Sequence, residues 1–264
     1  MLRSVFGKTL WDQRRGILFW SLGIAAVGVL YAAFYPTINS PEMAAALEAY
    51  PKGLLDAIGF TDVTTPAGYI GSTTYGLLGP ILVIIFAGTL GARAVAGEEE
   101  AGRLDLLLAH PVERWQVVLQ RAAALLVALL AAGIVLLAVM LAAAGPAQFS
   151  GIGPVNLAAA TAQLVLLGLV FGTLTLFVGA ATGRRGPALG LLAVLGVAAY
   201  LANTLGPSVD AIAWSQKLSP FFYYSGGMPL RNGWQPADGL VLLAASALLV
   251  ALAVVSLRRR DLAV

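Results

Sequence analysis

Residues 122–144 read AAALLVALLAAGIVLLAVMLAAA, a run of 23 residues without one charged or polar side chain. A bilayer core of about 30 Å is crossed by about 20 apolar residues of α-helix, so this run predicts a transmembrane span. Outward from it, five more stretches reach that length: residues 17–35, 69–92, 155–181, 187–205 and 240–257. Apolar residues make up 59% of the chain and charged ones 11%, far from the balance of soluble domains. We therefore expect one all-α polytopic membrane domain over residues 1–264, with six spans and a retained first span.

The orientation follows from the basic residues, because Lys and Arg gather on the cytosolic side of a membrane. If the N-terminus is cytosolic, thirteen of the 16 basic residues fall on the inner side and three on the outer side. The inner set is Arg3, Lys8, Arg14, Arg15, Arg93, Arg103, Arg114, Arg121, Arg184, Arg185, Arg258, Arg259 and Arg260, and the outer set is Lys52, Lys217 and Arg231. This count places both termini in the cytosol.

Two segments outside the spans are amphipathic or aromatic. Residues 1–16 carry apolar side chains on one helical face and basic ones elsewhere, which predicts an elbow helix on the inner membrane surface. Residues 206–238 are rich in aromatic residues and broken by prolines, so they form either a re-entrant or interfacial segment or an ordinary aromatic belt.

None of the six spans contains a charged residue. This limits the kinds of transport and catalysis that the chain can carry out. Ion-coupled carriers and intramembrane enzymes rely on buried acids, bases or metal ligands, and channels need a hydrophilic pore lining. The chain has no Cys and a single His, His110, so neither a His-based catalytic pair nor a two-histidine metal site can be assembled. We expect no enzyme activity from this chain alone, and no cofactor or metal bound to it.

The fourth expected span has a stripe of small residues. Gly168, Gly172, Gly179 and Gly183 stay within a narrow arc of the helix and allow a neighbouring helix to approach closely. Two alternatives remain for this stripe, namely packing within the chain and the seam of a dimer.

The segment between the second and third spans predicts a helix over residues 97–111. Its glutamates suit the positive N-terminal end of a helix, and Pro111 stops it. Glu99 and Arg103 are spaced for an ion pair along one face. The apolar face that has to be covered consists of Ala101, Leu104, Leu107 and Leu108.

Residues 98–114, EEEAGRLDLLLAHPVER, carry a family resemblance. They resemble the segment between the second and third spans of bacterial type-2 ATP-binding-cassette (ABC) export permeases, with Glu113 where a small hydroxyl residue is expected. The elbow, the six spans and the aromatic outer loop are similar as well, so the resemblance covers nearly the whole chain.

The resemblance implies a half-transporter in the bacterial inner membrane. Such permeases lie in membrane lipid and pair with a second copy or a paralogous permease. They bind two ATPase subunits, and these subunits bind the ATP and Mg. The resemblance implies no nucleic acid partner. Residues 97–111 are then the coupling helix that docks into the ATPase. The coupling residues are Glu98, Glu99, Glu100, Arg103, Leu104, Asp105, Leu107 and Leu108.

The cargo is expected to be a hydrophobic or amphipathic molecule such as a drug or a lipid, because the spans carry no charge. The second and fifth spans line the path in similar exporters, which makes Tyr75, Phe86, Tyr200 and Asn203 the candidate path residues. The alternative is a membrane scaffold that recruits a soluble partner without transporting anything.

Overall fold

The computed structural model describes residues 4–40, 65–102 and 113–260. Every regular element within these ranges is helical: α1 (Val5–Ile38), α4 (Pro66–Ser72), η1 (Thr74–Leu78), α5 (Gly79–Ala94), α6 (Ala96–Glu100), α8 (Arg114–Ala144), α9 (Pro154–Thr182), α10 (Arg185–Leu205), η2 (Gly206–Ser208), η3 (Asp210–Leu218), α11 (Pro220–Ser225), α12 (Pro229–Asn232) and α13 (Pro236–Arg259). Six stretches are long and apolar enough to cross a membrane, namely α1, the run from α4 through α5, α8, α9, α10 and α13. The all-helical class and the six candidate spans are thus confirmed.

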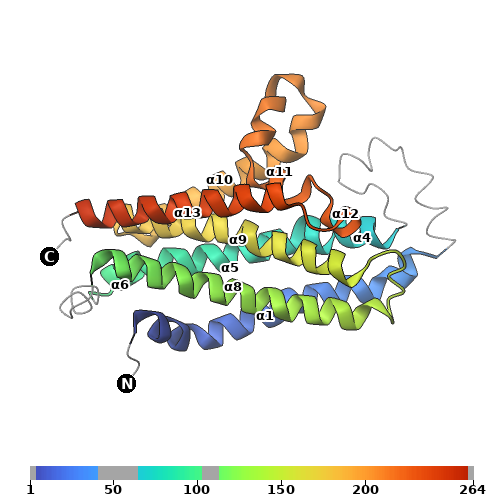
Figure 1. Ribbon diagram of the computed structural model, residues 1–264, viewed down its shortest axis with the longest axis horizontal. Helices are drawn as coiled ribbons and strands as arrows, with labels where there is room; N and C mark the ends of the chain where they lie inside the picture. Colours follow the sequence, from blue (N-terminus) through green and yellow to red (C-terminus); the bar gives the residue numbers. More distant parts are fainter. Residues whose placement is uncertain (1–3, 41–64, 103–112, 261–264) are drawn as a thin grey trace.

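The spans form an elongated bundle with α9 at its centre (Figure 1). In the most apolar stretch of each helix, the buried share is 83% for α9, compared with 22% for α13 and 11% for α10. Helix α9 packs against α5, α8, α10 and α13. A helix that is apolar all round belongs in the core of such an assembly, while α10 and α13 leave most of their surface for lipid or another chain.

The glycine stripe of α9 faces the neighbouring spans of the same chain. A Cβ on Gly168 would lie 2.4 Å from Val83 Cγ1 of α5, and one on Gly172 would lie 2.8 Å from Leu125 Cδ2 of α8. Gly91 lies on the α5 side of the interface with α9, and a Cβ there would lie 2.1 Å from the carbonyl oxygen of Gly172. Small residues here let the helix backbones approach closely. The interpretation of the stripe as packing within the chain is confirmed.

Residues 5–16, within the range predicted as an elbow, do not form a separate helix. Helix α1 is continuous from Val5 to Ile38, with Ser4 as its N-cap. Its first turn is bound to α8, because the main-chain N–H of Phe6 donates to Gln120 Oε1 at 3.0 Å. Extending an existing helix adds one hydrogen bond per residue, whereas starting a new one requires another nucleus, so the basic segment continues into the span.

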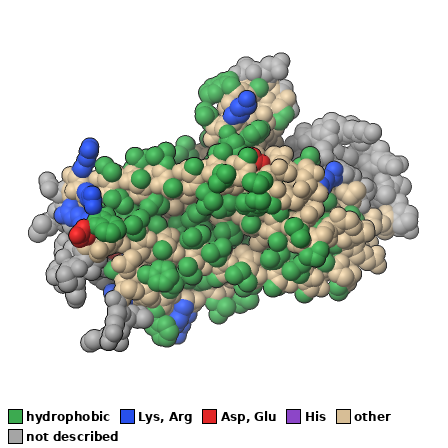
Figure 2. Space-filling view, in the orientation of Figure 1, with side chains coloured by type: hydrophobic (Ala, Val, Ile, Leu, Met, Phe, Trp, Pro, Cys, Tyr) green, Lys and Arg blue, Asp and Glu red, His purple; other side chains and the backbone are tan. Residues whose placement is uncertain are grey.

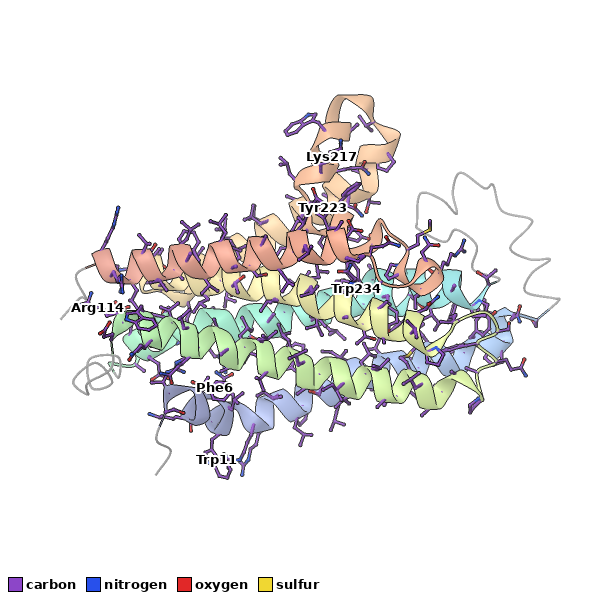
Figure 3. All side chains as sticks on the ribbon, in the orientation of Figure 1. Phe6, Trp11, Arg114, Lys217, Tyr223 and Trp234 are labelled. Atoms are coloured by element: carbon purple, nitrogen blue, oxygen red, sulfur yellow. The ribbon has the colours of Figure 1, made fainter. Side chains whose placement is uncertain are left out.

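The charges separate along the bundle. Figure 2 shows hydrophobic side chains over its length and a concentration of Lys and Arg at one end. This end, where α1, α8 and α10 begin and α5, α9 and α13 end, is called the basic end below. Figure 3 shows Arg114 at the basic end and Lys217 on a segment that stands away from the bundle.

The aromatic segment 206–238 is built from η2, η3, α11 and α12. Trp214 in η3 is exposed, whereas Phe221 and Tyr224 in α11 are buried in the core. The segment thus combines an outlying part with a part that is anchored in the bundle.

Candidate functional site

The helix predicted over residues 97–111 is not continuous. Helix α6 begins at Ala96 and ends at Glu100, and Gly102 has a φ of 64°. A glycine in this left-handed conformation is a common helix stop, because it carries no Cβ to oppose the positive φ. The other predicted coupling residues, Arg103, Leu104, Asp105, Leu107 and Leu108, lie outside the described residues.

The three glutamates of α6 each bind an arginine of a different helix. Glu98 Oε1 lies 3.5 Å from Arg121 Nη2 of α8. Glu99 pairs with Arg260, which ends α13. Glu100 pairs with Arg185 of α10 and also accepts the main-chain N–H of Arg185 at 2.7 Å. A five-residue helix is therefore tied to three spans at the basic end.

The ion pairs differ in their exposure. Arg121 is 6% exposed and Glu98 16%, so this pair is the most deeply buried. In the most exposed pair Arg185 is 44% exposed and Glu100 31%. Hydrogen bonds from the main chain and the side chain of Arg185 hold the pKa of Glu100 below its usual range. Glu100 is therefore poised to stay ionised while Arg185 remains in place.

Helix α8 begins directly after the loop, and Glu113 serves as its N-cap. The Glu113 side chain accepts the main-chain N–H of Gln116, while the main-chain N–H of Glu113 donates to Gln116 Oε1 at 3.2 Å. This reciprocal arrangement is a capping box, in which a hydroxyl residue more often occupies the first position. The carboxylate at residue 113 thus caps the start of α8.

A cavity of about 900 Å³ opens at the opposite end of the bundle. Its walls come from α1, α4, η1, α10 and the α11–α12 region. Three of the four predicted path residues, Tyr75, Tyr200 and Asn203, line it together with Tyr31, Tyr69 and Tyr224. No Asp or Glu is among the described residues of its wall. The cavity therefore offers aromatic surfaces, neutral hydrogen-bonding groups and one cation, Arg231.

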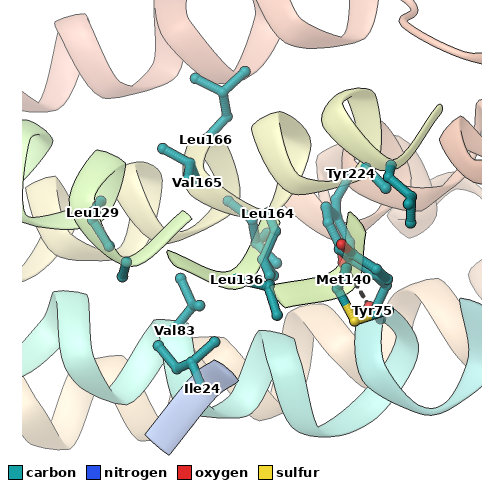
Figure 4. Packing of buried hydrophobic residues seen from close by; sticks show 14 of the residues in the cluster. Ile24, Tyr75, Val83, Leu129, Leu136, Met140, Leu164, Val165, Leu166 and Tyr224 are labelled. Carbon is teal, nitrogen blue, oxygen red and sulfur yellow. Dashed lines mark hydrogen bonds between the residues drawn. The ribbon is translucent and has the colours of Figure 1, made fainter. Parts of the chain in front are cut away.

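Tyr75 stands in a turn of π-helix at the edge of this cavity. A Cβ on Gly79 would lie 2.2 Å from the carbonyl oxygen of Thr74, so this tight turn requires a glycine. The Tyr75 hydroxyl is 2.8 Å from Thr161 Oγ1 of α9, and the Tyr224 hydroxyl donates to the Tyr75 carbonyl at 2.6 Å. Figure 4 shows Tyr75 and Tyr224 meeting beside the packed core. A π-turn of this kind is frequent at functional sites.

Comparison with known families agrees with this architecture. The family described as "Multidrug efflux system permease Rv1217c, C-terminal domain" matches residues 2–258. The chain belongs to this permease family. No curated protein sequence matches it. A multi-pass membrane location follows from the family and from the six apolar helices together.

The fourth predicted path residue of this permease family member lies elsewhere. Phe86 is 1% exposed, and its ring stacks on Trp20 of α1 with 5.7 Å between the ring centroids. It packs α5 against α1 and does not line the cavity. The periodicity of an apolar span does not distinguish the side of the helix that faces a cavity from the side that faces a neighbour.

An apolar groove of about 490 Å³ runs between α5 and α10. Leu77 and Tyr200 line both this groove and the tyrosine-lined cavity, so the two spaces adjoin at those residues. The groove wall on α10 includes Leu189, Leu192 and Gly196, spaced along one helical face. The permease thus presents an apolar space and a more polar one side by side.

Sequence reasoning missed the arginine partners of the glutamates. It paired Glu99 with Arg103, four residues away, whereas Glu99 binds Arg260 across 161 residues and Glu100 binds Arg185 across 85. One signal pointed towards such partners. Three adjacent acids beside charge-free spans require counter-charges nearby, and arginines at the same side of the membrane were the available ones.

Proposed function

We propose that this chain is the membrane-spanning permease subunit of an ATP-driven ABC exporter in the bacterial inner membrane. In this proposal the basic end and both termini lie in the cytosol, and a second permease copy or paralogue completes the path. Two separate ATPase subunits bind ATP and Mg, while this chain binds neither. The transporter moves a hydrophobic or amphipathic molecule out of the cytosol by alternating access.

The observation that carries the proposal is the attachment of α6. This short helix holds the first three residues of the 98–114 segment that resembles the coupling region of such exporters. It is joined to α8, α10 and α13 by Glu98, Glu99 and Glu100. A partner that displaces residues 103–112 therefore pulls on three spans at once.

The two adjoining spaces support the substrate class. A volume of about 900 Å³ is within the range of roughly 300–1,000 Å³ that small-molecule sites occupy. The groove accepts an apolar group and the tyrosine-lined cavity accepts a hydrogen-bonding one, which fits an amphipathic drug or lipid. An inorganic cation finds no carboxylate among the described residues of either wall, and Arg231 on the cavity wall suits an anionic or polar head of an amphipathic molecule.

The test begins with purification of the full-length permease from its native membrane. We expect an ATPase to co-purify, and we expect inverted membrane vesicles to accumulate the lipophilic dye Nile red on addition of ATP. Leu107→Asp places a charge on the predicted apolar face of the coupling segment and should abolish both effects. Leu106→Asp, the same change off that face, is the matched control and should preserve them.

Two outcomes would overturn the proposal. If the permease binds an ATPase but vesicles gain no ATP-dependent dye, the chain acts as the recruiting scaffold instead. If no ATPase co-purifies and neither substitution changes anything, the coupling assignment of residues 97–111 is wrong.

A further inference from the structure

Arg260 joins four helices at the basic end. Its Nη2 pairs with Glu99 of α6, and its Nη1 donates to the carbonyl oxygen of Ala180 in α9 at 3.1 Å. Its own carbonyl oxygen accepts from Arg114 Nη1 of α8 at 2.9 Å. Because Arg260 is also the C-cap of α13, one residue connects α6, α8, α9 and α13.

The backbone at the end of α9 leaves room for this pair. Gly183 has a φ of 69°, and a Cβ there would lie 2.6 Å from both Arg260 Nη2 and Glu99 Oε1. A Cβ at this C-cap would require the ends of both charged side chains to shift. The glycine therefore serves the ion pair as well as the end of the helix.

The pair is poorly suited to a purely stabilising role. The side chains of Arg260 and Glu99 are 20% and 15% exposed, and Glu99 Oε2 is buried without a hydrogen-bond partner in the described part of the chain. Desolvation offsets most of what a buried ion pair gains, whereas removal of one partner leaves an uncompensated charge. Such a contact fixes the relative position of two helices more strongly than it stabilises the fold.

The other two ion pairs connect α6 differently. Glu98 binds Arg121 of α8, the span that immediately follows the loop in the chain. Glu100 binds Arg185 at the exposed edge, where salt screens the attraction. Glu99 alone among the three reaches α13, the last span.

We infer that Arg260 is a positioning residue that makes α13 follow the movement of α6, through its ion pair with Glu99. This inference rests on the proposed function, in which α6 receives the movement of an ATPase. It assigns Glu99 to a contact within the permease and leaves the partner-facing contacts to the residues after Gly102.

A distance measurement tests the pair without any ATPase. The sequence contains no Cys, so Ala101→Cys and Val255→Cys, both at exposed positions, can carry spin labels in the full-length permease in lipid nanodiscs. We expect one narrow distance distribution, broadened by Arg260→Glu or Glu99→Arg and narrowed again in the charge-swapped double variant. Arg259→Glu, an exposed neighbour, is the matched control and should leave it narrow.

A transport measurement tests the consequence. We expect each single variant to lower dye accumulation per ATP hydrolysed by about five- to tenfold, at the low end of typical allosteric coupling. The charge swap should return this ratio to near the wild-type value, which distinguishes positioning from misfolding. Yield and a single elution peak in size-exclusion chromatography identify any variant that fails to fold.

The inference is overturned if the single variants keep the narrow distribution, or if they keep the wild-type ratio of transport to hydrolysis. Loss of the ratio without rescue by the swap also overturns it, because the pair is then not what carries the effect. A wild-type permease without ATP-dependent transport would overturn the proposed function instead, and the spin-label distances would still test the pair.

Discussion

Gly91→Ala tests a close backbone approach in the bundle, where α5 crosses α9. The added Cβ would lie 2.1 Å from the carbonyl oxygen of Gly172 and 2.3 Å from Thr175 Oγ1. Contacts of this kind essentially never fall under 3.0 Å, so the helices must separate by almost 1 Å at this point. The obstacle is backbone, which cannot rotate away as a side chain can.

The expected cost follows from three effects. Overpacking a tight interface costs about 1–3 kcal/mol, and the upper end applies here because a backbone atom is opposed. Displacing the Thr175 hydroxyl from its 2.9 Å hydrogen bond to Gly172 O costs about 1 kcal/mol more. The better helix propensity of Ala returns about 1 kcal/mol. The net prediction is a loss of about 3 kcal/mol in the free energy of unfolding.

The assay is unfolding in mixed micelles by titration with SDS, followed by tryptophan fluorescence. Gly190→Ala is the matched control, because its Cβ meets nothing within 4 Å, and it should stabilise the permease by up to about 1 kcal/mol. Gly88→Ala should fall between the two, since its Cβ is opposed by the movable Leu192 side chain at 2.1 Å. Equal stability of the Gly91 and Gly190 variants would refute the close packing of α5 on α9.

Three further predictions concern the polar contacts. Glu98→Ala removes the carboxylate that pairs with the buried Arg121 and should lower the free energy of unfolding by about 3–5 kcal/mol, whereas the double variant that also replaces Arg121 by Met should recover most of it in the same titration. Tyr75→Phe removes the hydroxyl bound to Thr161 and should cost about 1 kcal/mol, and a double-mutant cycle with Thr161→Val that shows full additivity would contradict this bond. The lowered pKa of Glu100 means that its ion pair contributes fully above the ordinary carboxyl pKa of about 4.3, and that the contribution is lost as pH falls through the lower folded-state pKa. Glu100→Gln should flatten the stability profile in that acidic window, as measured by thermal unfolding against pH, and an unchanged profile would assign the acid sensitivity to other groups.

The six spans could be read from the chain because each is a local property. The bilayer core demands about 20 apolar residues in succession, and six runs satisfied that demand. The points at which helices are interrupted or continue were harder to predict from the sequence. The π-turn at Tyr75, the stop at Gly102 and the absence of a break after residue 16 depend on hydrogen-bond partners that composition does not reveal.

The candidate site was likewise predictable only in part. The family resemblance pointed to Tyr75, Tyr200 and Asn203 on the second and fifth spans, but Phe86, chosen on the same ground, faces Trp20 instead of the cavity. A helical period defines a face without identifying the neighbour on it. The direction of a face is settled by packing against helices that are distant in the chain.

The amino-acid sequence by itself determined that this is a helical membrane protein with its basic residues at one end, because hydrophobic length and charge are sums over neighbouring residues. The tertiary structure alone decided which arginine neutralises each glutamate of α6 and where the tyrosine-lined cavity opens. Those outcomes join residues as far as 161 positions apart, such as Glu99 and Arg260. Ion pairs and cavities are set by distances in space, and only the packed bundle defines them.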